Sequence, residues 1–316
     1  MRVGVSIVVY HSDLGQLERT LAALERQTHR PDGLRVHVND ADRDRQETES
    51  VRRLTEGLGT VSESPENRGF AAAHNGCLSD LFAAGADAVL ILNPDLELEP
   101  DAIAVLLAST ADHPCCLAGP LLLLADPLTG VADGTLDSAG IVWTRSGRHL
   151  DVGQGRRTAR PAATTRVAGI SGACLLVPAA AHRRIVDVSG EFFDEAFLAY
   201  REDAELGFRA ELLGIPSLLV PAAVGRHVRQ LRGTTRATSP MINRLGVRNR
   251  FLIAAKYRLQ RPGGRLAPWV RDLVVIGGVL TKERSSIPGI RDAWHLRDEM
   301  RRKGDRVLAH KVRSDA

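Results

Sequence analysis

Residues 91–100 read ILNPDLELEP, an apolar run that stops at Asn93-Pro94-Asp95. Together with the residues before it, DAVLILN, this run has the length and aliphatic content of a buried β-strand. Polar side chains directly after such a strand have two explanations. They can form an ordinary turn, or the carboxylate of Asp95 can hold a metal ion at the end of a central strand.

Before this stretch the chain alternates between predicted strands and predicted helices. Residues 3–10, VGVSIVVY, form a β-branched run of strand length. Asp13 is a predicted helix N-cap, followed by four leucines on one helical face: Leu14, Leu17, Leu21 and Leu24. The pattern continues with a strand at 34–38, a polar helix near 45–58, a short strand around Val61 and an alanine-rich helix from Phe70 to Ala84. This alternation predicts an α/β fold with a mostly parallel sheet covered on both faces.

Polar residues stand at the carboxyl ends of these predicted strands. Tyr10, Asn39, Asn67 and the Asn93-Pro94-Asp95 turn all occupy such positions. In open α/β sheets, ligands bind beyond the carboxyl ends of the strands. The sequence therefore predicts a ligand site along this edge of the sheet.

The pattern changes after residue 114. Short β-like runs separated by glycine turns extend from 115 to 178 and predict a mixed sheet. A helix near 202–213 and a strand in IPSLLVP follow. The segment 226–240 is rich in Arg, Thr and Gly and predicts a mobile loop, and the chain after it is basic and helical.

Charge is divided unevenly along the chain. The formal net charge is +4, but from Arg226 to the end there are 22 Lys and Arg against 7 Asp and Glu, a balance of +15. The first 225 residues then carry a balance of −11. This asymmetry predicts an acidic catalytic half and a basic tail that meets an anionic partner, which can be a membrane surface, a phosphate-bearing substrate or nucleic acid.

The cysteines and the N-terminus indicate the compartment. Cys77, Cys115, Cys116 and Cys174 follow neither metal-ligand nor disulfide spacing, which is typical of small hydrophobic residues in a reducing environment. No basic, apolar and small-residue signal sequence precedes the first strand. We therefore expect a cytoplasmic protein.

Two asparagines in the segment 65–78, PENRGFAAAHNGCL, are candidate donor-binding residues. Asn67 precedes a helix whose first backbone N–H groups suit a phosphate or the polar edge of a base. Asn75 is one of the few polar residues in that helix. An ordinary helix cap and a buried amide explain the same two residues.

Glu202, Asp203 and His227 are candidate catalytic or metal-binding residues. A carboxylate at the N-terminus of the helix near 202–213 is stabilised in its ionised form and can accept a proton from an acceptor hydroxyl. His227 follows a predicted strand and can supply an imidazole ligand to a metal. The structural alternatives are carboxylates that complement the helix dipole and a lone surface or core histidine.

The order and spacing of these motifs resemble one family of enzymes. In chain order they are Tyr10, Asn67-Arg68-Gly69-Phe70, Asn93-Pro94-Asp95, Ser171-Gly172-Ala173, Phe193-Asp194-Glu195, Glu202-Asp203 and His227. This series resembles the family 2 inverting glycosyltransferases with the GT-A fold, and within them the bacterial branch of rhamnosyl- and galactofuranosyltransferases. The resemblance covers residues 3 to about 250 and includes the pair Arg248-Asn249.

The resemblance implies a role for each matching residue. Asp95 matches the last residue of the Asp-X-Asp metal motif, whose first position is Asn93 here, and His227 matches a metal-binding histidine of some members. Asp203 matches the catalytic base and Glu202 its neighbour. The implied donor and nucleotide contacts are Tyr10, Asn39, Asn67, Arg68, Gly69, Asn75, Asn93 and Gly172. Asn39 replaces an Asp that usually reads the base, although an Asn can still bond a pyrimidine edge.

The implied activity is transfer of a sugar from a nucleotide diphosphate donor, with inversion and with Mn²⁺ or Mg²⁺ as cofactor. The implied donor is dTDP-rhamnose or a related pyrimidine sugar, and the acceptor is a glycan, lipid-linked or small-molecule hydroxyl in polysaccharide biosynthesis for the cell envelope. We expect a GT-A domain at 1–240, with a nucleotide-sugar half at 1–114 and an acceptor half at 115–240, and a basic helical region at 241–316. Asp95, Asp203 and His227 should then meet around one hollow of pyrophosphate size.

Two other functions compete with this interpretation. A nucleotidyltransferase has a similar sheet, but it needs a Gly-rich basic phosphate loop that YHSDLGQLERT lacks. A sugar-nucleotide-binding or scaffold relative that has lost catalysis agrees with Asn93 and Asn39. Nucleic acid is not an expected partner, because the basic tail has no recognisable module and few aromatic residues for stacking.

An apolar stripe in the tail has two explanations. The segment RLAPWVRDLVVIGGVLT places six apolar residues on one helical face: Leu266, Trp269, Val270, Leu273, Ile276 and Leu280. With 17 residues, and with Arg271 and Asp272 inside it, this segment is a poor spanning helix. It can cover the core, or it can lie on the inner face of the cell membrane next to anionic headgroups.

Overall fold

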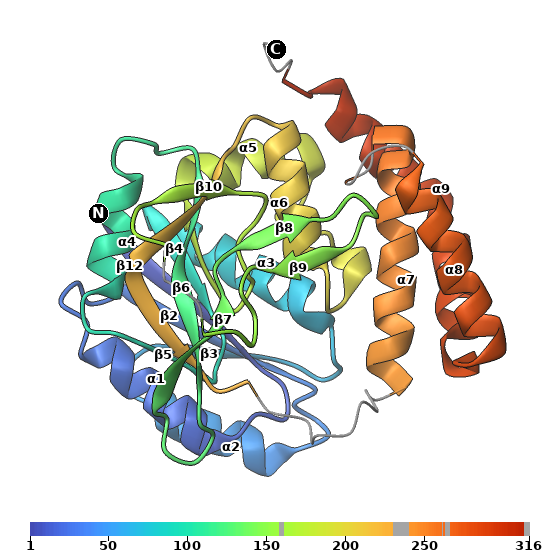
Figure 1. Cartoon of the computed structure of the whole chain (residues 1–316). Helices are drawn as coiled ribbons and strands as arrows, with labels where there is room; N and C mark the ends of the chain where they lie inside the picture. The colour runs from blue at the N-terminus through green and yellow to red at the C-terminus, as the bar shows by residue number, and fades with distance from the viewer. Residues whose placement is uncertain (158–160, 230–239, 261, 263–265, 313–316) are drawn as a thin grey trace.

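The computed structural model describes residues 1–157, 161–229, 240–260, 262 and 266–312. At its centre is a ten-stranded sheet with the order β10-β12-β6-β11-β4-β1-β2-β3, in which β5 also pairs with β12 and β7 with β6. Helices cover both faces of this sheet (Figure 1). The predicted α/β fold is confirmed.

The first half of the chain builds the parallel part of the sheet. β1 pairs in parallel with β2 and β4, and β2 pairs in parallel with β3. Asp13 caps the first helix as predicted, because its Oδ1 accepts a hydrogen bond from Gln16 N at 3.0 Å. The elements are β1 (Val3–Val9), α1 (Leu14–Glu25), β2 (Gly33–Asn39), α2 (Arg45–Thr55), β3 (Thr60–Ser64), α3 (Gly69–Ala83), β4 (Ala88–Leu92), β5 (Leu96–Leu98) and α4 (Ala102–Thr110).

The second half adds strands of both directions, as predicted. β11 runs antiparallel to β4 and β6, whereas β12 runs parallel to β6, and β8 and β9 form a separate hairpin. The elements are β6 (Leu117–Ala125), β7 (Ala132–Ser138), β8 (Ile141–Trp143), β9 (His149–Asp151), β10 (Thr165–Val167), β11 (Cys174–Pro178), α5 (Ala179–Ser189), the 3₁₀ turn η1 (Glu195–Phe197), α6 (Glu202–Leu212) and β12 (Ser217–His227).

The last strand is longer than its sequence pattern indicates. β12 continues past Pro221 to His227 through an irregularity in its pairing with β6 between Val220 and Val224. The start of the predicted mobile loop at 226–240 is therefore wrong, because Arg226 and His227 are strand residues. Residues 230–239 of that loop lie outside the described part of the chain.

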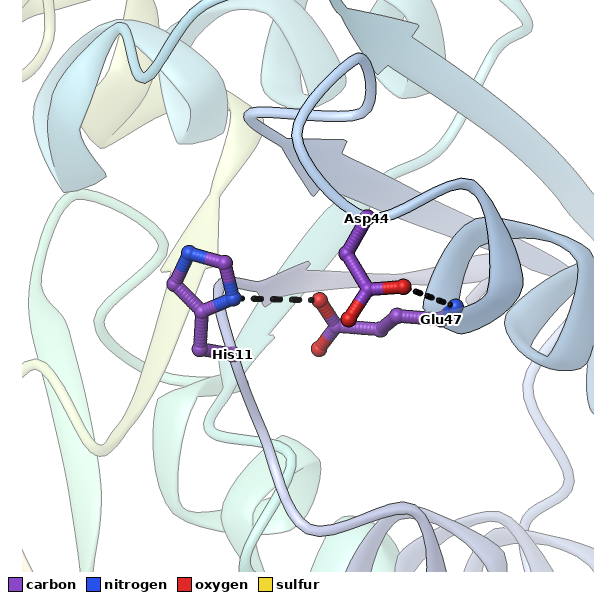
Figure 2. Close-up of side chains that lie close together, drawn as sticks. All are labelled: His11, Asp44 and Glu47. Carbon is purple, nitrogen blue, oxygen red and sulfur yellow. Dashed lines mark hydrogen bonds and ion pairs between the residues drawn. The ribbon is translucent and has the colours of Figure 1, made fainter.

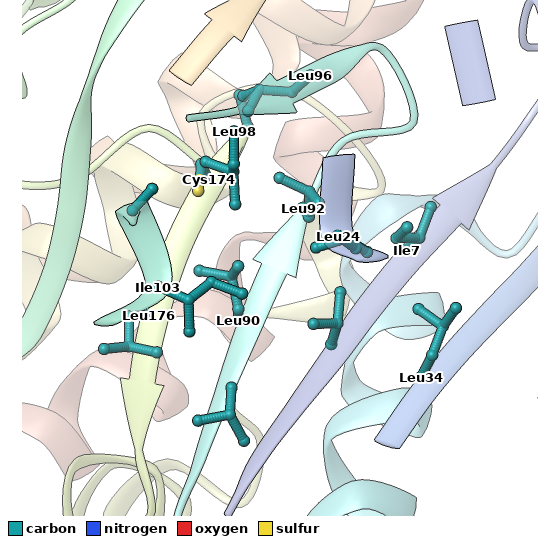
Figure 3. Close-up of a cluster of buried hydrophobic side chains, with 14 of the residues drawn as sticks. Ile7, Leu24, Leu34, Leu90, Leu92, Leu96, Leu98, Ile103, Cys174 and Leu176 are labelled. Carbon is teal, nitrogen blue, oxygen red and sulfur yellow. The ribbon is translucent and has the colours of Figure 1, made fainter. Parts of the chain in front are cut away.

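The core forms two layers because side chains alternate along the strands. In β4, Leu90 and Leu92 pack in the layer under α1, α2 and α4, whereas Val89 and Ile91 pack in the layer under α3, α5 and α6. Figure 3 shows the first layer, where Leu90 and Leu92 lie among side chains from β1, β5 and β11. Both faces of β4 are buried, which explains why the stretch before Asn93 is continuously apolar.

Three further helices complete the described chain: α7 (Pro240–Tyr257), α8 (Ala267–Thr281) and α9 (Ile287–Ala309). The second core layer includes Leu252 and Tyr257 from α7 and Met300 from α9. The 3₁₀ turns η2 (Arg258–Gln260) and η3 (Arg284–Ser286) connect these helices. α7 and α9 therefore cover the core.

α8 behaves differently from its two neighbours. It lies farther from the sheet than α7 (Figure 1). Val279 of α8 is buried, but Leu266 just before the helix and five large apolar side chains on it are exposed: Trp269, Val270, Leu273, Val274 and Leu280. Among the described residues, no helix combines the length and the apolar character needed to cross a membrane.

Candidate active site

Asp95 and His227 meet at the carboxyl edge of the sheet. β12 pairs with β5 so that His227 lies opposite Leu96. His227 Nε2 and Asp95 Oδ1 are 3.2 Å apart, and Val228 N donates to the Asp95 carbonyl oxygen at 2.9 Å. Two candidate ligands that are 132 positions apart in the sequence are therefore in direct contact.

Asp137 is a member of this group that the sequence did not indicate. Its carboxylate is fully buried, and its Oδ2 lies 2.7 Å from His227 Nδ1. Burial alone would raise the pKa of Asp137, but the hydrogen bond and charge of His227 and the charge of Arg229 hold it below its usual value. Asp137 stands in β7 without a motif around it, so only the contact with His227 reveals it.

The arrangement of these three side chains suits a divalent cation. Asp137 fixes the Nδ1 side of His227, so that Nε2 is directed at Asp95, as carboxylates do for metal-binding histidines. The separation of 3.2 Å between Nε2 and Oδ1 is close to the about 3 Å expected between neighbouring ligands with metal bonds of about 2.1 Å. Mg²⁺ is typically held by one or two protein ligands together with substrate phosphates.

A second group of possible ligands lies near the end of β1. His11, Asp44 and Glu47 bring their ligand atoms within 4.8 Å of one another (Figure 2). Their contacts also have a structural explanation. Asp44 caps α2 by accepting from Glu47 N at 2.9 Å, and Glu47 accepts from Ser12 N at 2.8 Å. Because these bonds tie the loop after β1 to α2, the group needs no ion to account for it.

Asp203 stands at the N-terminus of α6 and contacts the turn before β11. Its Oδ2 accepts from Gly172 N at 3.1 Å, and its Oδ1 accepts from Ala204 N at 2.7 Å. The same turn contacts the end of β4, where Asn93 N donates to the Ala173 carbonyl oxygen at 2.9 Å. The turn at 171–173 therefore joins Asp203 to the Asn93-Pro94-Asp95 segment.

Arg229 and Asp151 form a second connection between the Asp95–His227–Asp137 group and the surroundings of Asp203. Arg229 lies 3.1 Å from Asp137 and 3.5 Å from Asp151. Burial and the nearby charge of Asp203 raise the pKa of Asp151 to about 6. Short contacts thus link Asp95 and His227 to Asp151 through Asp137 and Arg229, and Asp203 is near enough for its charge to act on Asp151. Neither Asp151 nor Arg229 was a sequence candidate.

Glu202 differs from its neighbour Asp203. Its side chain is buried, and its Oε2 has no hydrogen-bond partner. Burial and the charge of Asp203 raise the pKa of Glu202 to about 8. At neutral pH Glu202 is therefore mostly protonated, and it is a poor candidate for a proton acceptor.

Asn39 holds the Asn67-Arg68-Gly69 loop, which is predicted to contact the nucleotide and is called the nucleotide loop below. Its Oδ1 accepts from Arg68 N at 3.2 Å and from Ser64 Oγ at 3.0 Å, and its Nδ2 donates to the Gly69 carbonyl oxygen at 3.2 Å. Asn39 is 2% exposed, whereas Asn67 and Arg68 are exposed. Asn39 therefore shapes the loop from inside, and Asn67 and Arg68 are the side chains that a ligand can reach.

Gly69 fits a place that no other residue would tolerate. Its φ is +83°, and a Cβ there would lie 2.6 Å from the Leu198 carbonyl oxygen. The close approach brings the nucleotide loop against the segment that leads to Asp203. Gly69 thereby connects the two predicted halves of the domain.

Tyr10 and Asn75 occupy different surroundings. Tyr10 is 40% exposed at the end of β1, with its ring 4.4 Å from that of His11. Asn75 instead holds the Phe193-Asp194-Glu195 segment, because its amide bonds Phe193 N, the Phe193 carbonyl oxygen and the Glu195 carboxylate. The donor contact predicted for Asn75 therefore has no support from its geometry.

Asn249 positions the segment before Asp203. Its Nδ2 donates to the carbonyl oxygens of Phe197, Ala199 and Tyr200 at 2.9, 2.9 and 2.7 Å. Leu198, Tyr200 and Arg201 all have positive φ, a conformation that costs energy for non-glycine residues. The sequence singled out the Arg248-Asn249 pair but indicated no task for Asn249.

Comparison with known proteins identifies the fold. No family model matches the chain. It is 29% identical, over 245 residues, to the N-acetylglucosaminyl-diphospho-decaprenol L-rhamnosyltransferase of Mycobacterium tuberculosis, in strains CDC 1551 and H37Rv. The match covers 70% of this chain and 74% of that protein.

Two solved structures are similar in fold. The structure of GalNAc-T7 with UDP, GalNAc and Mn²⁺ matches 81% of this chain with a TM-score of 0.60 and 17% identity, and this chain spans about half, 48%, of that protein. The mannosyltransferase PcManGT of Pyrobaculum calidifontis, in complex with GDP-Man and Mn²⁺, matches 98% of this chain and 85% of its own, with a TM-score of 0.53 and 15% identity. These comparisons confirm the predicted resemblance to a rhamnosyltransferase and the GT-A fold.

Proposed function

We propose that this chain, which has the GT-A fold and resembles a mycobacterial rhamnosyltransferase, is an inverting family 2 glycosyltransferase. It moves a sugar from a nucleotide diphosphate, with dTDP-rhamnose as our first candidate, to a hydroxyl of a lipid-linked glycan. The observation that carries this proposal is the contact of Asp95 with the His227–Asp137 pair, at the same edge of the sheet as Asp203. The Mn²⁺ bound by both structural neighbours supports a divalent cation in this enzyme.

In the proposed single-displacement reaction, each candidate residue has a separate role. Asp203 accepts the proton of the acceptor hydroxyl as its oxygen attacks the anomeric carbon. Asn67 and Arg68, which are exposed directly before α3, would contact the nucleotide. Asp95 and His227 would hold Mn²⁺ or Mg²⁺, whose charge stabilises the departing diphosphate.

Incubation of the purified protein with nucleotide sugars, Mn²⁺ and a lipid-linked N-acetylglucosamine acceptor tests the proposed activity. We expect acceptor-dependent release of dTDP from dTDP-rhamnose and a new disaccharide product. A nucleotide-sugar-binding relative without catalysis would show thermal stabilisation by the donor but no product. If no nucleotide sugar, with either a pyrimidine or a purine base, stabilises the protein or gives a product, the proposal is contradicted.

Replacement of Asp137 by Asn should weaken activation by Mn²⁺ by about 10–100-fold, because the partner of a metal-binding histidine sets its orientation and basicity. Titration of the transfer rate with Mn²⁺ measures this change. The control is Asp133→Asn on the same strand, since Asp133 is exposed and pairs with Arg157. In the unchanged protein, excess chelator should abolish transfer; a full rate in chelator would remove the metal from the mechanism.

Activation by Mn²⁺ should also depend on pH. Burial alone would lower the pKa of His227, but hydrogen bonds to Asp137 and Asp95 outweigh burial and raise it to about 9. A metal must displace this proton, so the apparent affinity for Mn²⁺ should rise with pH up to about 9. An affinity that is constant between pH 6 and pH 9, at about the same ionic strength, would exclude His227 as a ligand.

The exposed apolar side chains of α8 should bind to a membrane surface. The double variant Leu273→Gln/Val274→Gln removes two apolar side chains that are 70% and 68% exposed, so it should spare the fold but weaken binding to phosphatidylglycerol vesicles by about tenfold or more. Flotation measures the bound fraction. Removal of the whole tail is a poorer test, because α9 contributes Met300 and Val307 to the core.

The matched control for this experiment is Leu128→Gln/Val131→Gln. These apolar side chains are 89% and 62% exposed and belong to the β6–β7 turn. Their replacement should leave vesicle binding unchanged. Equal flotation of both double variants and the unchanged protein would show that α8 does not touch the membrane.

A further inference from the structure

The chain that leads into the proposed catalytic base has an unusual backbone at residues 197–201. Three of these five residues have positive φ, which residues other than glycine rarely adopt: Leu198, Tyr200 and Arg201. Leu198, with φ of 61° and ψ of −72°, is the centre of a γ-turn, which Ala199 N closes by donating to the Phe197 carbonyl oxygen at 2.8 Å. A γ-turn with positive φ is rare and strained. Segment 197–201 therefore depends on outside contacts to keep this conformation.

The side chain of Asn249 in α7 supplies such contacts. Leu198 and Tyr200 are 39% and 43% exposed, so the packing of their side chains contributes little to holding the segment. Three carbonyl oxygens of the segment instead accept hydrogen bonds from Asn249 Nδ2, at 2.9, 2.9 and 2.7 Å. One of these oxygens precedes Leu198 and two follow it. Asn249 therefore fastens the backbone on both sides of the γ-turn.

Arg248 fixes the orientation of the Asn249 amide. Its Nη1 donates to Asn249 Oδ1 at 2.8 Å, and both side chains are buried. A guanidinium group can only donate hydrogen bonds, so the oxygen of the amide faces Arg248 and the NH₂ group faces the carbonyl oxygens of the segment. The two residues of the Arg248-Asn249 pair therefore act together on segment 197–201.

The nucleotide loop and the first turn of α3 contact the same γ-turn. The Leu198 carbonyl oxygen accepts a hydrogen bond from Ala71 N at 3.3 Å. Gly69 approaches this oxygen so closely that a Cβ on Gly69 would lie 2.6 Å from it. The γ-turn is therefore held by two elements, by α7 through Asn249 and by the N-terminus of α3.

Gly172 limits the space that the side chain of Asp203 can occupy. The N–H of Gly172 donates to Asp203 Oδ2 at 3.1 Å. A Cβ on Gly172 would lie 3.3 Å from the ring of Phe70, in the first turn of α3, and 3.5 Å from Asp203 Cβ. The base and the first turn of α3 therefore lie against the same glycine, which leaves little room for Asp203 to move relative to the nucleotide loop.

Segment 197–201 also sets the direction in which α6 begins. Arg201 is the N-cap residue of α6, with φ of 73° and ψ of −3°, and makes no side-chain capping bond. N-cap residues usually have an extended backbone and a capping side chain, so this helix start is imposed by the segment before it. If Arg201 relaxed to negative φ, the first turn of α6 would point elsewhere and Asp203 would leave Gly172 N. A displacement of about 1 Å at a reacting group can cost about 10²-fold in rate.

We propose that Asn249 is a positioning residue for the catalytic base. It holds segment 197–201 in its strained conformation, so that Asp203 stays bonded to Gly172 N and keeps a fixed position relative to the nucleotide loop. Asn249 is 0% exposed, so it acts through the segment and does not contact a substrate. This inference rests on the proposed function, because it explains how the base of that reaction is held in place.

The variant Asn249→Asp tests the inference by steady-state kinetics. It keeps the size of the side chain but places an oxygen against three carbonyl oxygens. With dTDP-rhamnose and the lipid-linked N-acetylglucosamine acceptor, kcat should fall by about 10²-fold, whereas the affinity for dTDP-rhamnose should change by less than about threefold. An unchanged kcat would overturn the inference. If Asn249→Asp does not fold, Arg248→Met replaces it; loss of the bond that orients the amide should lower kcat by about threefold or more.

A double variant distinguishes positioning of the base from a general structural defect. If Asn249 acts only through Asp203, addition of Asn249→Asp to Asp203→Asn should lower the residual transfer rate by less than about threefold. Single-turnover measurements give this residual rate. An equal loss of about 10²-fold in both backgrounds would overturn the positioning role, because a general defect lowers both rates alike.

The matched control is Leu245→Ala on the same helix. Leu245 is 6% exposed and lies one helical turn before Asn249. Its truncation should lower the temperature of thermal unfolding but leave kcat close to that of the parent. A loss of kcat as large as that of Asn249→Asp would overturn the inference, because any loosening of α7 would then have the same effect.

Hydrogen exchange, followed by mass spectrometry, tests the inference without turnover. Gly172 N and Ala204 N both donate to Asp203, so their exchange reports whether the base stays in place. Peptides that contain them should exchange about tenfold or more faster in Asn249→Asp, while the buried strand β4 exchanges as in the parent. Unchanged exchange at both sites would overturn the inference, even if the protein proves to be a glycosyltransferase. A parent protein without turnover would contradict the proposed function, and the exchange rates would still decide whether Asn249 holds Asp203.

Discussion

Replacement of Asp203 by Asn should lower the rate of sugar transfer by about 10²–10⁴-fold, which is the usual contribution of a general base. The amide cannot accept the proton of the acceptor hydroxyl. It keeps the size of the side chain, and its one oxygen can accept one of the two hydrogen bonds that Gly172 N and Ala204 N donate to Asp203. Donor affinity should therefore change much less than kcat. Steady-state kinetics together with donor titration separate the two effects.

The control for this prediction is the adjacent Glu202→Gln. Burial and, to a smaller extent, the charge of Asp203 raise the pKa of Glu202 to about 8. The neutral form of Glu202 therefore already predominates at pH 7. A neutral amide of the same size should lower the rate by less than about tenfold. A large loss in Glu202→Gln with substantial turnover in Asp203→Asn would transfer the role of the base to Glu202.

Replacement of Lys256 by Met should lower the free energy of unfolding by about 3–5 kcal/mol, the usual effect of removing one partner from a buried ion pair. Lys256 of α7 is 2% exposed and lies 2.6 Å from Asp194 and 2.8 Å from Glu205, both fully buried. Burial would raise the pKa of Asp194, but Lys256 and Lys303 hold it well below its usual value. Loss of Lys256 leaves these carboxylates short of positive charge. Urea unfolding measures the change.

The matched control is Arg258→Met. Arg258 also joins the end of α7 to α9, through Asp305 at 3.0 Å, but these side chains are 51% and 58% exposed. An exposed pair contributes about 0–1 kcal/mol, so this variant should be nearly as stable as the parent. Equal destabilisation by both substitutions would contradict the importance of the buried network.

The buried network of Lys256, Asp194 and Glu205 should make the free energy of unfolding depend on pH. The pKa of Asp194 and that of Glu205 are both lowered in the folded protein, against the effect of burial, by nearby Lys and Arg side chains. A carboxyl group whose pKa is lowered by folding stabilises the fold at pH values above its pKa in the unfolded chain, which is about 4. This stabilisation is lost as the pH falls further. Lys256→Met should therefore lose less stability on acidification than the parent.

The Phe193-Asp194-Glu195 motif illustrates the limit of pattern recognition. Its place in the series helped to identify the resemblance, but the pattern did not reveal that Asp194 bonds Lys256 and Lys303. These lysines follow at distances of 62 and 109 residues. No local periodicity relates residues so far apart, so only the tertiary structure shows the ionic connection between the C-terminal helices and the rest of the chain.

The sequence alone determined the elements of the fold and the edge of the sheet where polar residues gather. Alternating strands and helices, apolar runs such as 88–92 and turns such as Asn93-Pro94-Asp95 are local signals, because burial and backbone preference act over a few residues. The tertiary structure decided which of these residues meet. Asp137 joins His227 and Arg229 reaches Asp151, because the pairing of distant strands creates contacts that no sequence spacing encodes.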